Sequence, residues 1–106
     1  MLFELRQYRV RPGRRDEWVR FMDEVIIPFQ VAKGMTIVGT FVAEEDPDLY
    51  VWIRRFEDDS ERQRLYEAVY ESEHWKTAIA PHTTELLGDE PMVVTRLIPT
   101  ARSEMR

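Results

Sequence analysis

Three charged residues in strand-like segments are the first candidates for chemistry. Glu4 and Arg6 are two positions apart near the N-terminus, and Arg54 lies in a later run of β-forming residues. A guanidinium group binds a carboxylate or a phosphate with two parallel hydrogen bonds. A carboxylate that is half-buried among aromatic rings has a raised pKa, which suits a general base. These residues predict a site in which Arg6 or Arg54 binds a polar ligand and Glu4 is a candidate base.

A second interpretation of the same residues is structural. Glu4 can pair with one of the two arginines and simply make an interface specific. Tyr8 and Trp52 have the same parity as the charged residues, so they share the same strand faces. Their rings can stack on a flat ligand or form the apolar core of an interface. The predicted ligand-binding set is Glu4, Arg6, Tyr8, Trp52 and Arg54.

No metal site and no cofactor are predicted. The chain has no cysteine, and its two histidines, His74 and His82, lack the spacing of a zinc-binding pair. The sequence also contains no glycine-rich phosphate loop and no nucleophile-elbow motif.

Composition narrows the class of partner. Fifteen basic against twenty acidic residues give a net charge of −5, which disfavours nucleic acid. The longest apolar stretch, residues 35–43, is too short to span a bilayer, and Glu4 and Arg6 interrupt the region where a signal peptide is apolar. We therefore expect a cytoplasmic protein with no nucleic-acid and no membrane partner. Its 106 residues fit a single domain, 1–106.

Strand and helix patterns alternate along the chain. β-forming runs predict strands at 2–10, 35–43, 49–56 and 92–98. Apolar stripes at helical spacing predict helices between the first two strands and between the last two. The order β-α-β-β-α-β is that of the α+β ferredoxin-like fold, a four-stranded antiparallel sheet with both helices on one face. Gly39 predicts a bulge or a close approach, and residues 100–106 are predicted to be a disordered tail.

Side-chain alternation separates the two faces of this sheet, except in the fourth strand, whose two sets are both mixed. The apolar set is predicted to lie under the helices: Phe3, Leu5, Met35, Ile37, Phe41, Leu49, Val51 and Ile53. The other set contains the charged residues together with Tyr8, Tyr50, Trp52 and Phe56. That face is too aromatic to be exposed and too charged for an ordinary core. We therefore expect a homodimer in which two such faces cover each other and enclose a cavity.

The same residues resemble the NIPSNAP family. The segments that carry the resemblance are FELRQYRVRPGRRDEW, IVGTF, VWIRRFEDDSERQRLY and the EHWK around Trp75. They match, in order and spacing, a strand ending E-L-R-x-Y, a P-G before the first helix, a V-G in the second strand, an aromatic strand end followed by E-D, an E-R entering the second helix and a late E-W. The resemblance covers about residues 2–98 and implies a ferredoxin-like protomer of the dimeric α/β-barrel superfamily.

The resemblance implies less about function than about fold. The family has no defined biochemical activity. The resemblance therefore implies only what the architecture suggests, namely a protein that binds a small molecule in a cavity of a dimeric α/β barrel. Relatives in the superfamily include cofactor-independent monooxygenases and isomerases, so an enzyme of this kind is one alternative function. Some relatives bind haem through a helix histidine, and His82 is the candidate for that role here. Larger eukaryotic members are associated with mitochondria and protein interactions, so a non-catalytic interaction module is the second alternative. Whether Glu4, Arg6 and Arg54 surround free space or bind one another separates a pocket from a structural network.

Overall fold

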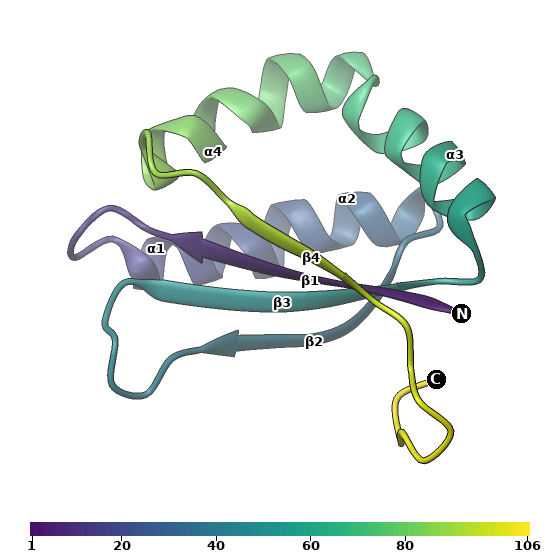
Figure 1. Cartoon of the computed structure of the whole chain (residues 1–106). Helices are drawn as coiled ribbons and strands as arrows, with labels where there is room; N and C mark the ends of the chain where they lie inside the picture. The colour runs from purple at the N-terminus through teal and green to yellow at the C-terminus, as the bar shows by residue number, and fades with distance from the viewer.

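The computed structural model describes all 106 residues as one antiparallel sheet with helices on one of its faces (Figure 1). The strands are β1 (Leu2–Arg9), β2 (Thr36–Val42), β3 (Leu49–Phe56) and β4 (Val93–Leu97). Helices α1 (Arg15–Phe21) and α2 (Ile27–Ala32) connect β1 to β2, and α3 (Asp59–Tyr70) and α4 (Ala80–Leu87) connect β3 to β4. The predicted β-α-β-β-α-β order is confirmed, and the strand order β2-β3-β1-β4 is that of the ferredoxin-like fold.

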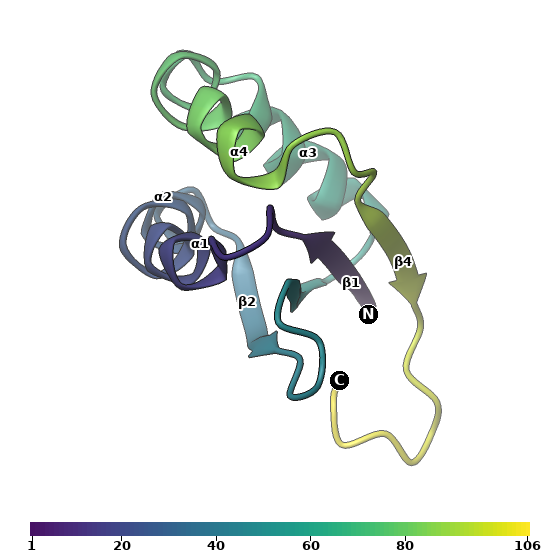
Figure 2. The same cartoon turned by 90° about the vertical axis from the view of Figure 1, so that its left-hand side faces the viewer.

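The helices form two arms that lie side by side above the sheet (Figure 2). Each arm contains a π-helical turn shortly before a proline: Met22–Ile26 precedes Pro28, and Trp75–Ile79 precedes Pro81. A proline removes one amide donor and crowds the preceding turn, and a wider π turn accommodates that irregularity. Because Ile26 and Trp75 from these two turns line the space between the arms and the sheet, the irregular turns shape the interior. None of the helices has the length and apolar character that a membrane span requires.

The central strands β1 and β3 bring the predicted site residues into one row. Their antiparallel register pairs Glu4 with Arg54, Arg6 with Trp52, and Tyr8 with Tyr50. Directly opposed residues point to the same face of a sheet, so these three pairs form a continuous strip. The strip is almost completely buried, since the exposed fractions of Glu4, Trp52 and Arg54 are 1%, 1% and 0%.

The predicted assignment of the two sheet faces is wrong for β1 and β3. The charged and aromatic strip lies under the helices, where Arg54 bonds Gln30 of α2 and Tyr70 of α3, and Tyr8 packs against Trp18 of α1. The expectation that Trp52, Tyr50 or Phe56 would be buried between two protomers is therefore wrong as well, because the chain's own helices cover them. Buried charges are tolerated here because they are paired and hydrogen-bonded with one another.

The outward face of the sheet, which we call the open face, carries most of the set that was expected in the core. Leu5, Val51 and Ile53 are half-buried there, and Phe41 is 54% exposed. In β2 the register shifts between Ile37 and Gly39, as the glycine predicts, so Ile37 packs towards the helices while Phe41 faces outward. A Cβ atom on Gly39 would lie 2.8 Å from the Phe41 ring, so this glycine also permits a close approach.

The C-terminal segment extends below the open face (Figure 1). It contributes Ile98, Pro99 and Met105 to a concave region that also includes Phe3, which is only 4% exposed. Residues 100–106, for which the sequence predicts disorder, form a turn in which Arg106 Nε donates to the Ser103 carbonyl over 2.8 Å.

Candidate functional site

A cluster of five hydrogen-bonded polar side chains lies between the sheet and α3, and we call it the polar cluster. Its members come from four elements of the fold: Glu4, Gln30, Arg54, Tyr66 and Tyr70. Arg54 Nε and Nη2 donate to Glu4 Oε1 over 3.2 and 2.5 Å, and the Tyr66 hydroxyl donates to Glu4 Oε2. Each oxygen of this carboxylate therefore has a partner in the protein.

Arg54 is equally well satisfied on its other side. Its Nη1 donates to Gln30 Oε1 over 2.9 Å and to the Tyr70 hydroxyl over 2.7 Å. Its guanidinium carbon also lies 4.8 Å from the centre of the Trp52 ring and 5.2 Å from that of Tyr66, which are cation–π distances. Glu4 and Arg54 thus bind each other, which is the structural arrangement among the alternatives that the sequence leaves open.

The environment of Glu4 argues against its expected role as a base. Burial by itself raises the pKa of Glu4, but the Arg54 charge and the hydrogen bonds from Tyr66 and Arg54 outweigh burial and lower it. A carboxylate with a lowered pKa is a weak proton acceptor at neutral pH. Burial raises the pKa of Tyr66 to about 12, so its hydroxyl remains a proton donor to Glu4.

Arg6 is the least satisfied charged group of the buried strip. Its Nη1 donates to the Tyr70 hydroxyl over 3.1 Å and lies 3.7 Å from Glu4 Oε1. Its Nη2 reaches only the thioether of Met92, with a nitrogen–sulfur distance of 3.6 Å. Its Nε is buried and has no hydrogen-bond partner among the protein atoms. A guanidinium carries five N–H donors, so Arg6 keeps donors that the protein does not use.

Arg6 lines a small cavity between the helical arms and the sheet, which we call the helix–sheet cavity. It has a volume of about 40 Å³, and its principal lining residues are Arg6, Tyr8, Trp18, Trp52, Trp75 and Met92. Tyr70 and Gln30 also line it, so the cavity adjoins the polar cluster. By the rule that one water needs roughly 10–15 Å³, this space holds a few waters or one small polar group.

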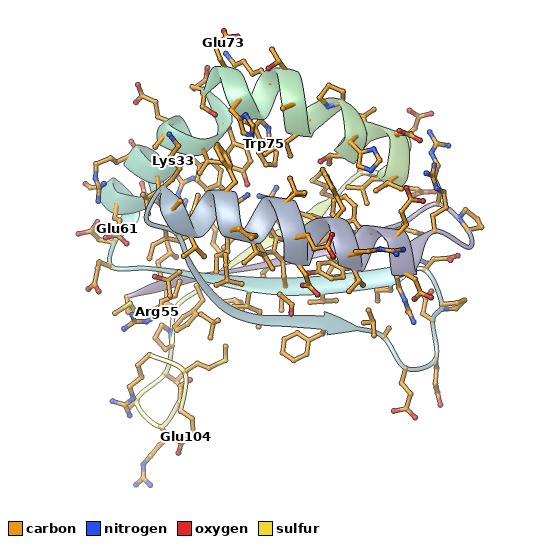
Figure 3. The ribbon with its side chains drawn as sticks, turned by 180° about the vertical axis from the view of Figure 1, so that it is seen from behind. Lys33, Arg55, Glu61, Glu73, Trp75 and Glu104 are labelled. Carbon is orange, nitrogen blue, oxygen red and sulfur yellow. The ribbon has the colours of Figure 1, made fainter.

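The wall of the cavity is mainly aromatic and apolar, and three of its lining residues have a buried N–H group without an acceptor in the protein. The indole Nε1 atoms of Trp18 and Trp52 are buried without a hydrogen-bond acceptor, like Arg6 Nε. Trp75, labelled in Figure 3, reaches from the second arm towards the first, with its ring 4.8 Å from that of Tyr70 and 6.4 Å from that of Phe29. Such a wall suits a ligand that offers an oxygen acceptor beside an apolar or flat body.

The structure therefore divides the predicted site residues. Arg6, Tyr8 and Trp52 line the cavity, whereas Glu4 and Arg54 belong to the polar cluster beside it. Sequence reasoning missed Trp18, Trp75 and Met92 as cavity residues. Both tryptophans lie at apolar positions of helical segments, which is typical of core residues, and Met92 begins the predicted strand 92–98, whose two faces the sequence does not separate.

His82 is not on the buried side of its helix. Its side chain is 36% exposed, lies 3.2 Å from Glu85 Oε2 and packs against Phe21. The inward positions of α4 and the turn before it are taken by Ile79 and Leu86 instead. The helix histidine that the resemblance offers as a haem ligand is therefore partly exposed and paired with Glu85, and no cluster of three metal-ligating side chains occurs in the structure.

Solved structures similar to this chain cover nearly its whole length. A NIPSNAP family protein from Agrobacterium tumefaciens is 25% identical, with a TM-score of 0.86 over 99% of this chain and 98% of that one. A second one from the same organism, of unknown function, is 21% identical, with a TM-score of 0.89 over 100% of this chain and 94% of that one. An antibiotic biosynthesis monooxygenase is 18% identical, with a TM-score of 0.68 over 94% of this chain and 99% of that one, which is a likeness of fold.

Among curated proteins, none matches this chain at a significant level. The sequence profile of the NIPSNAP family matches residues 3–103, which is almost the entire chain and includes every residue of the polar cluster and the cavity. This agrees with the resemblance carried by the E-L-R strand end and the W-I-R-R-F segment. The chain belongs to the NIPSNAP family.

Proposed function

We propose that this protein binds a small oxygen-bearing molecule in the helix–sheet cavity, with Arg6 as the principal binding residue. The observation that carries the proposal is the Arg6 guanidinium, whose buried Nε has no protein acceptor and whose Nη2 has only a thioether. A buried donor without a partner costs about 1–3 kcal/mol, and more when it is charged. An acceptor atom of a ligand would offset that cost.

The charges of the buried strip also favour an acceptor with negative character. Two arginines, the buried Arg54 and the partly buried Arg6, lie beside a single carboxylate, Glu4, which is bound directly to Arg54. Tyr66, Tyr70 and Gln30 contribute hydrogen bonds to this cluster but no charge when protonated. One positive charge therefore remains beside the cavity, and an anion or a strongly polarised carbonyl group would complement it.

Binding is better supported than proton-transfer catalysis. The only buried carboxylate, Glu4, is occupied by Arg54 and Tyr66, and its pKa is lowered. A general base must reach the substrate with an available acceptor atom, and neither oxygen of Glu4 is in that position. This is the reason to place a binding protein ahead of an isomerase.

The test is a comparison of two arginine variants by native mass spectrometry. Purified wild-type protein is expected to retain a small molecule, and Arg6→Leu is expected to lose it while remaining folded. Arg9→Leu is the matched control, because Arg9 lies on the same strand but is exposed and pairs with Asp46 at the surface. Retention of the same molecule by Arg6→Leu would contradict the proposal.

A cofactor-independent monooxygenase is the second candidate. It is supported by the fold shared with an antibiotic biosynthesis monooxygenase and by the three tryptophans that line the cavity. Such an enzyme would consume one O₂ for each small phenol that it converts to a quinone and water. Oxygen uptake that depends on added phenol and falls in Trp52→Phe would favour this alternative; no uptake above the buffer rate would eliminate this reaction.

We further propose that the open face joins two copies of the chain into a homodimer. Phe41, Val93, Leu97 and Ile98 are 54%, 52%, 40% and 80% exposed on or beside this face, and large exposed apolar patches are typical of interfaces. Sedimentation at micromolar concentration is expected to show a dimer, and Phe41→Asp a folded monomer. A monomeric wild-type protein would contradict the proposal and favour a different protein as the partner of this face.

A further inference from the structure

We infer that the ligand of the helix–sheet cavity carries a carboxylate group, which binds across Nε and Nη2 of Arg6 after displacing the Met92 side chain. The inference rests on the proposed function and names the chemical class of the ligand. It depends on three features of the structure: the donor edge of Arg6, the position of Met92, and the size and charge of the cavity.

The neighbouring arginine shows how this protein uses the same donor edge. Arg54 directs Nε and Nη2 at one carboxylate, that of Glu4, over 3.2 and 2.5 Å. These two groups form one side of the planar guanidinium and match the spacing of carboxylate oxygens. In Arg54 the acceptor is part of the chain itself.

In Arg6 the corresponding edge has no carboxylate. Its Nε makes no hydrogen bond to the protein, and its Nη2 contacts Met92 Sδ at 3.6 Å. A thioether sulfur is a weak acceptor, whereas an ionised carboxylate forms a short, charge-assisted hydrogen bond. The exchange of sulfur for a carboxylate oxygen at Nη2, with a second oxygen at Nε, is therefore favourable. Nη1 need not move, because it remains bonded to the Tyr70 hydroxyl.

Met92 lies where the cavity meets solvent. It lines the cavity and is nevertheless 42% exposed, so one part of its side chain faces Arg6 and another part faces water. Met92 immediately precedes β4, at the end of the connection that begins at Gly88, whose φ is +69°. An unbranched methionine side chain has several accessible rotamers, so it can leave Arg6 while β4 keeps its pairing with β1.

The size and charge of the cavity favour a carboxylate over a larger anion. About 40 Å³ accommodates a planar headgroup but not a whole aromatic ligand, so the body of the ligand must extend past Met92. One positive charge beyond the Glu4–Arg54 pair complements one negative charge, as in a monocarboxylate. A phosphate monoester carries nearly two charges at neutral pH and would leave one of them uncompensated.

The experiment observes the Arg6 Nε–H group directly by ¹H–¹⁵N NMR of the full chain. Sodium acetate and sodium benzoate are titrated as probes, with acetamide and benzamide as neutral controls of the same shape. Both carboxylates are expected to shift the Arg6 Nε–H signal downfield and to saturate, whereas the amides and the Arg54 Nε–H signal remain unchanged. Arg6→Lys keeps the charge but lacks the donor edge, so it is expected to bind benzoate about tenfold more weakly.

Met92 provides a test that does not remove the arginine. Met92→Ala opens the route to Arg6 and is expected to strengthen benzoate binding, while Met92→Leu, which keeps the volume, stays within about twofold of the wild type. Equal affinities for wild type and Met92→Ala would overturn the displacement. If the carboxylates leave the Arg6 signal unchanged while a co-purified molecule still requires Arg6, the carboxylate inference fails and the proposed function stands. If no molecule requires Arg6, both fail.

Discussion

The polar cluster and the helix–sheet cavity each contain an arginine, but the two guanidinium groups differ in how many of their donors have a hydrogen-bond acceptor. Arg54 and Arg6 lie on neighbouring strands and the same sheet face, yet only Arg54 has a carboxylate on its Nε–Nη2 edge. Nearly all buried polar groups in folded proteins are hydrogen-bonded, so a buried charge with unused donors requires an explanation. Burial and charge alone therefore do not distinguish a structural arginine from a ligand-binding one. The distinction lies in whether each donor of the guanidinium has an acceptor within the protein.

The two regions are also coupled through one hydroxyl group. The Tyr70 oxygen accepts from Arg54 Nη1 over 2.7 Å and from Arg6 Nη1 over 3.1 Å. The Tyr70 hydroxyl, which Arg54 holds in the polar cluster, therefore orients the Arg6 guanidinium. A rigid second layer of this kind is what a precise binding residue needs.

The largest effect is expected from the removal of Arg54. Arg54→Leu leaves the Glu4 carboxylate buried without its principal counter-charge, and the free energy of unfolding is expected to fall by about 3–5 kcal/mol. Urea denaturation monitored by tryptophan fluorescence measures it. A loss below about 1 kcal/mol, the range of an exposed ion pair, would mean that the pair has little structural importance.

An intermediate effect is expected from Tyr70→Phe. The substitution removes an acceptor shared by two buried guanidinium groups, and hydrogen bonds to charged groups contribute about 1.5–3 kcal/mol. Thermal and urea unfolding report the stability, and the NMR signal of Arg6 reports its orientation. A stable variant whose Arg6 signal is unperturbed would show that the two regions are independent.

The decline of the free energy of unfolding at acidic pH is expected to depend partly on Glu4. Its pKa in the folded protein is lowered from 4.5, so its ionised form contributes stability that is fully present above about pH 4.5 and disappears as pH falls through the folded value. Glu4→Gln cannot titrate, and its free energy of unfolding should therefore decline less steeply below pH 4.5 than that of the wild type. Parallel slopes for the two proteins would contradict this role of Glu4.

The smallest effect on stability is expected from Arg6→Leu. The substitution removes a charge with unused donors and leaves Tyr70 bonded to Arg54, so the free energy of unfolding should change by no more than about 1 kcal/mol. Circular dichroism melting checks the fold, and loss of the co-purified molecule checks the function. A loss as large as that of Arg54→Leu would place Arg6 in the structural network instead.

The sequence predicts the fold well because local and long-range signals agree. The helical stripe that begins at Trp18, the Pro12–Gly13 pair before it and the glycine in β2 each indicate an element that the structure contains. The main error concerns which face of β1 and β3 lies under the helices. Alternation divides β1 and β3 into two sets, but both sets are largely apolar, so parity alone does not show which one the helices cover.

The candidate site could be predicted in part for the same reason. Even-numbered positions place Arg6, Tyr8 and Trp52 on one sheet face, and they line one cavity, which lies under the helices and not between two protomers. The acceptors that satisfy Arg54, on Gln30 and Tyr70, are 24 and 16 residues away from it in the chain, and their convergence depends on how the helical arms pack. Strand periodicity therefore could not predict which of the two arginines has all its donors hydrogen-bonded within the protein.

The coupling energy between Glu4 and each arginine tests the distinction between the two regions most directly. Unfolding free energies of Glu4→Gln, Arg54→Leu, Arg6→Leu and the two double variants give both energies from two double-mutant cycles. We predict a coupling of about 2–3 kcal/mol between Glu4 and Arg54, with the double variant recovering much of the loss, and one below about 1 kcal/mol between Glu4 and Arg6. Equal couplings, or a larger one for Arg6, would show that both arginines belong to one structural network and would contradict the assignment of Arg6 to ligand binding.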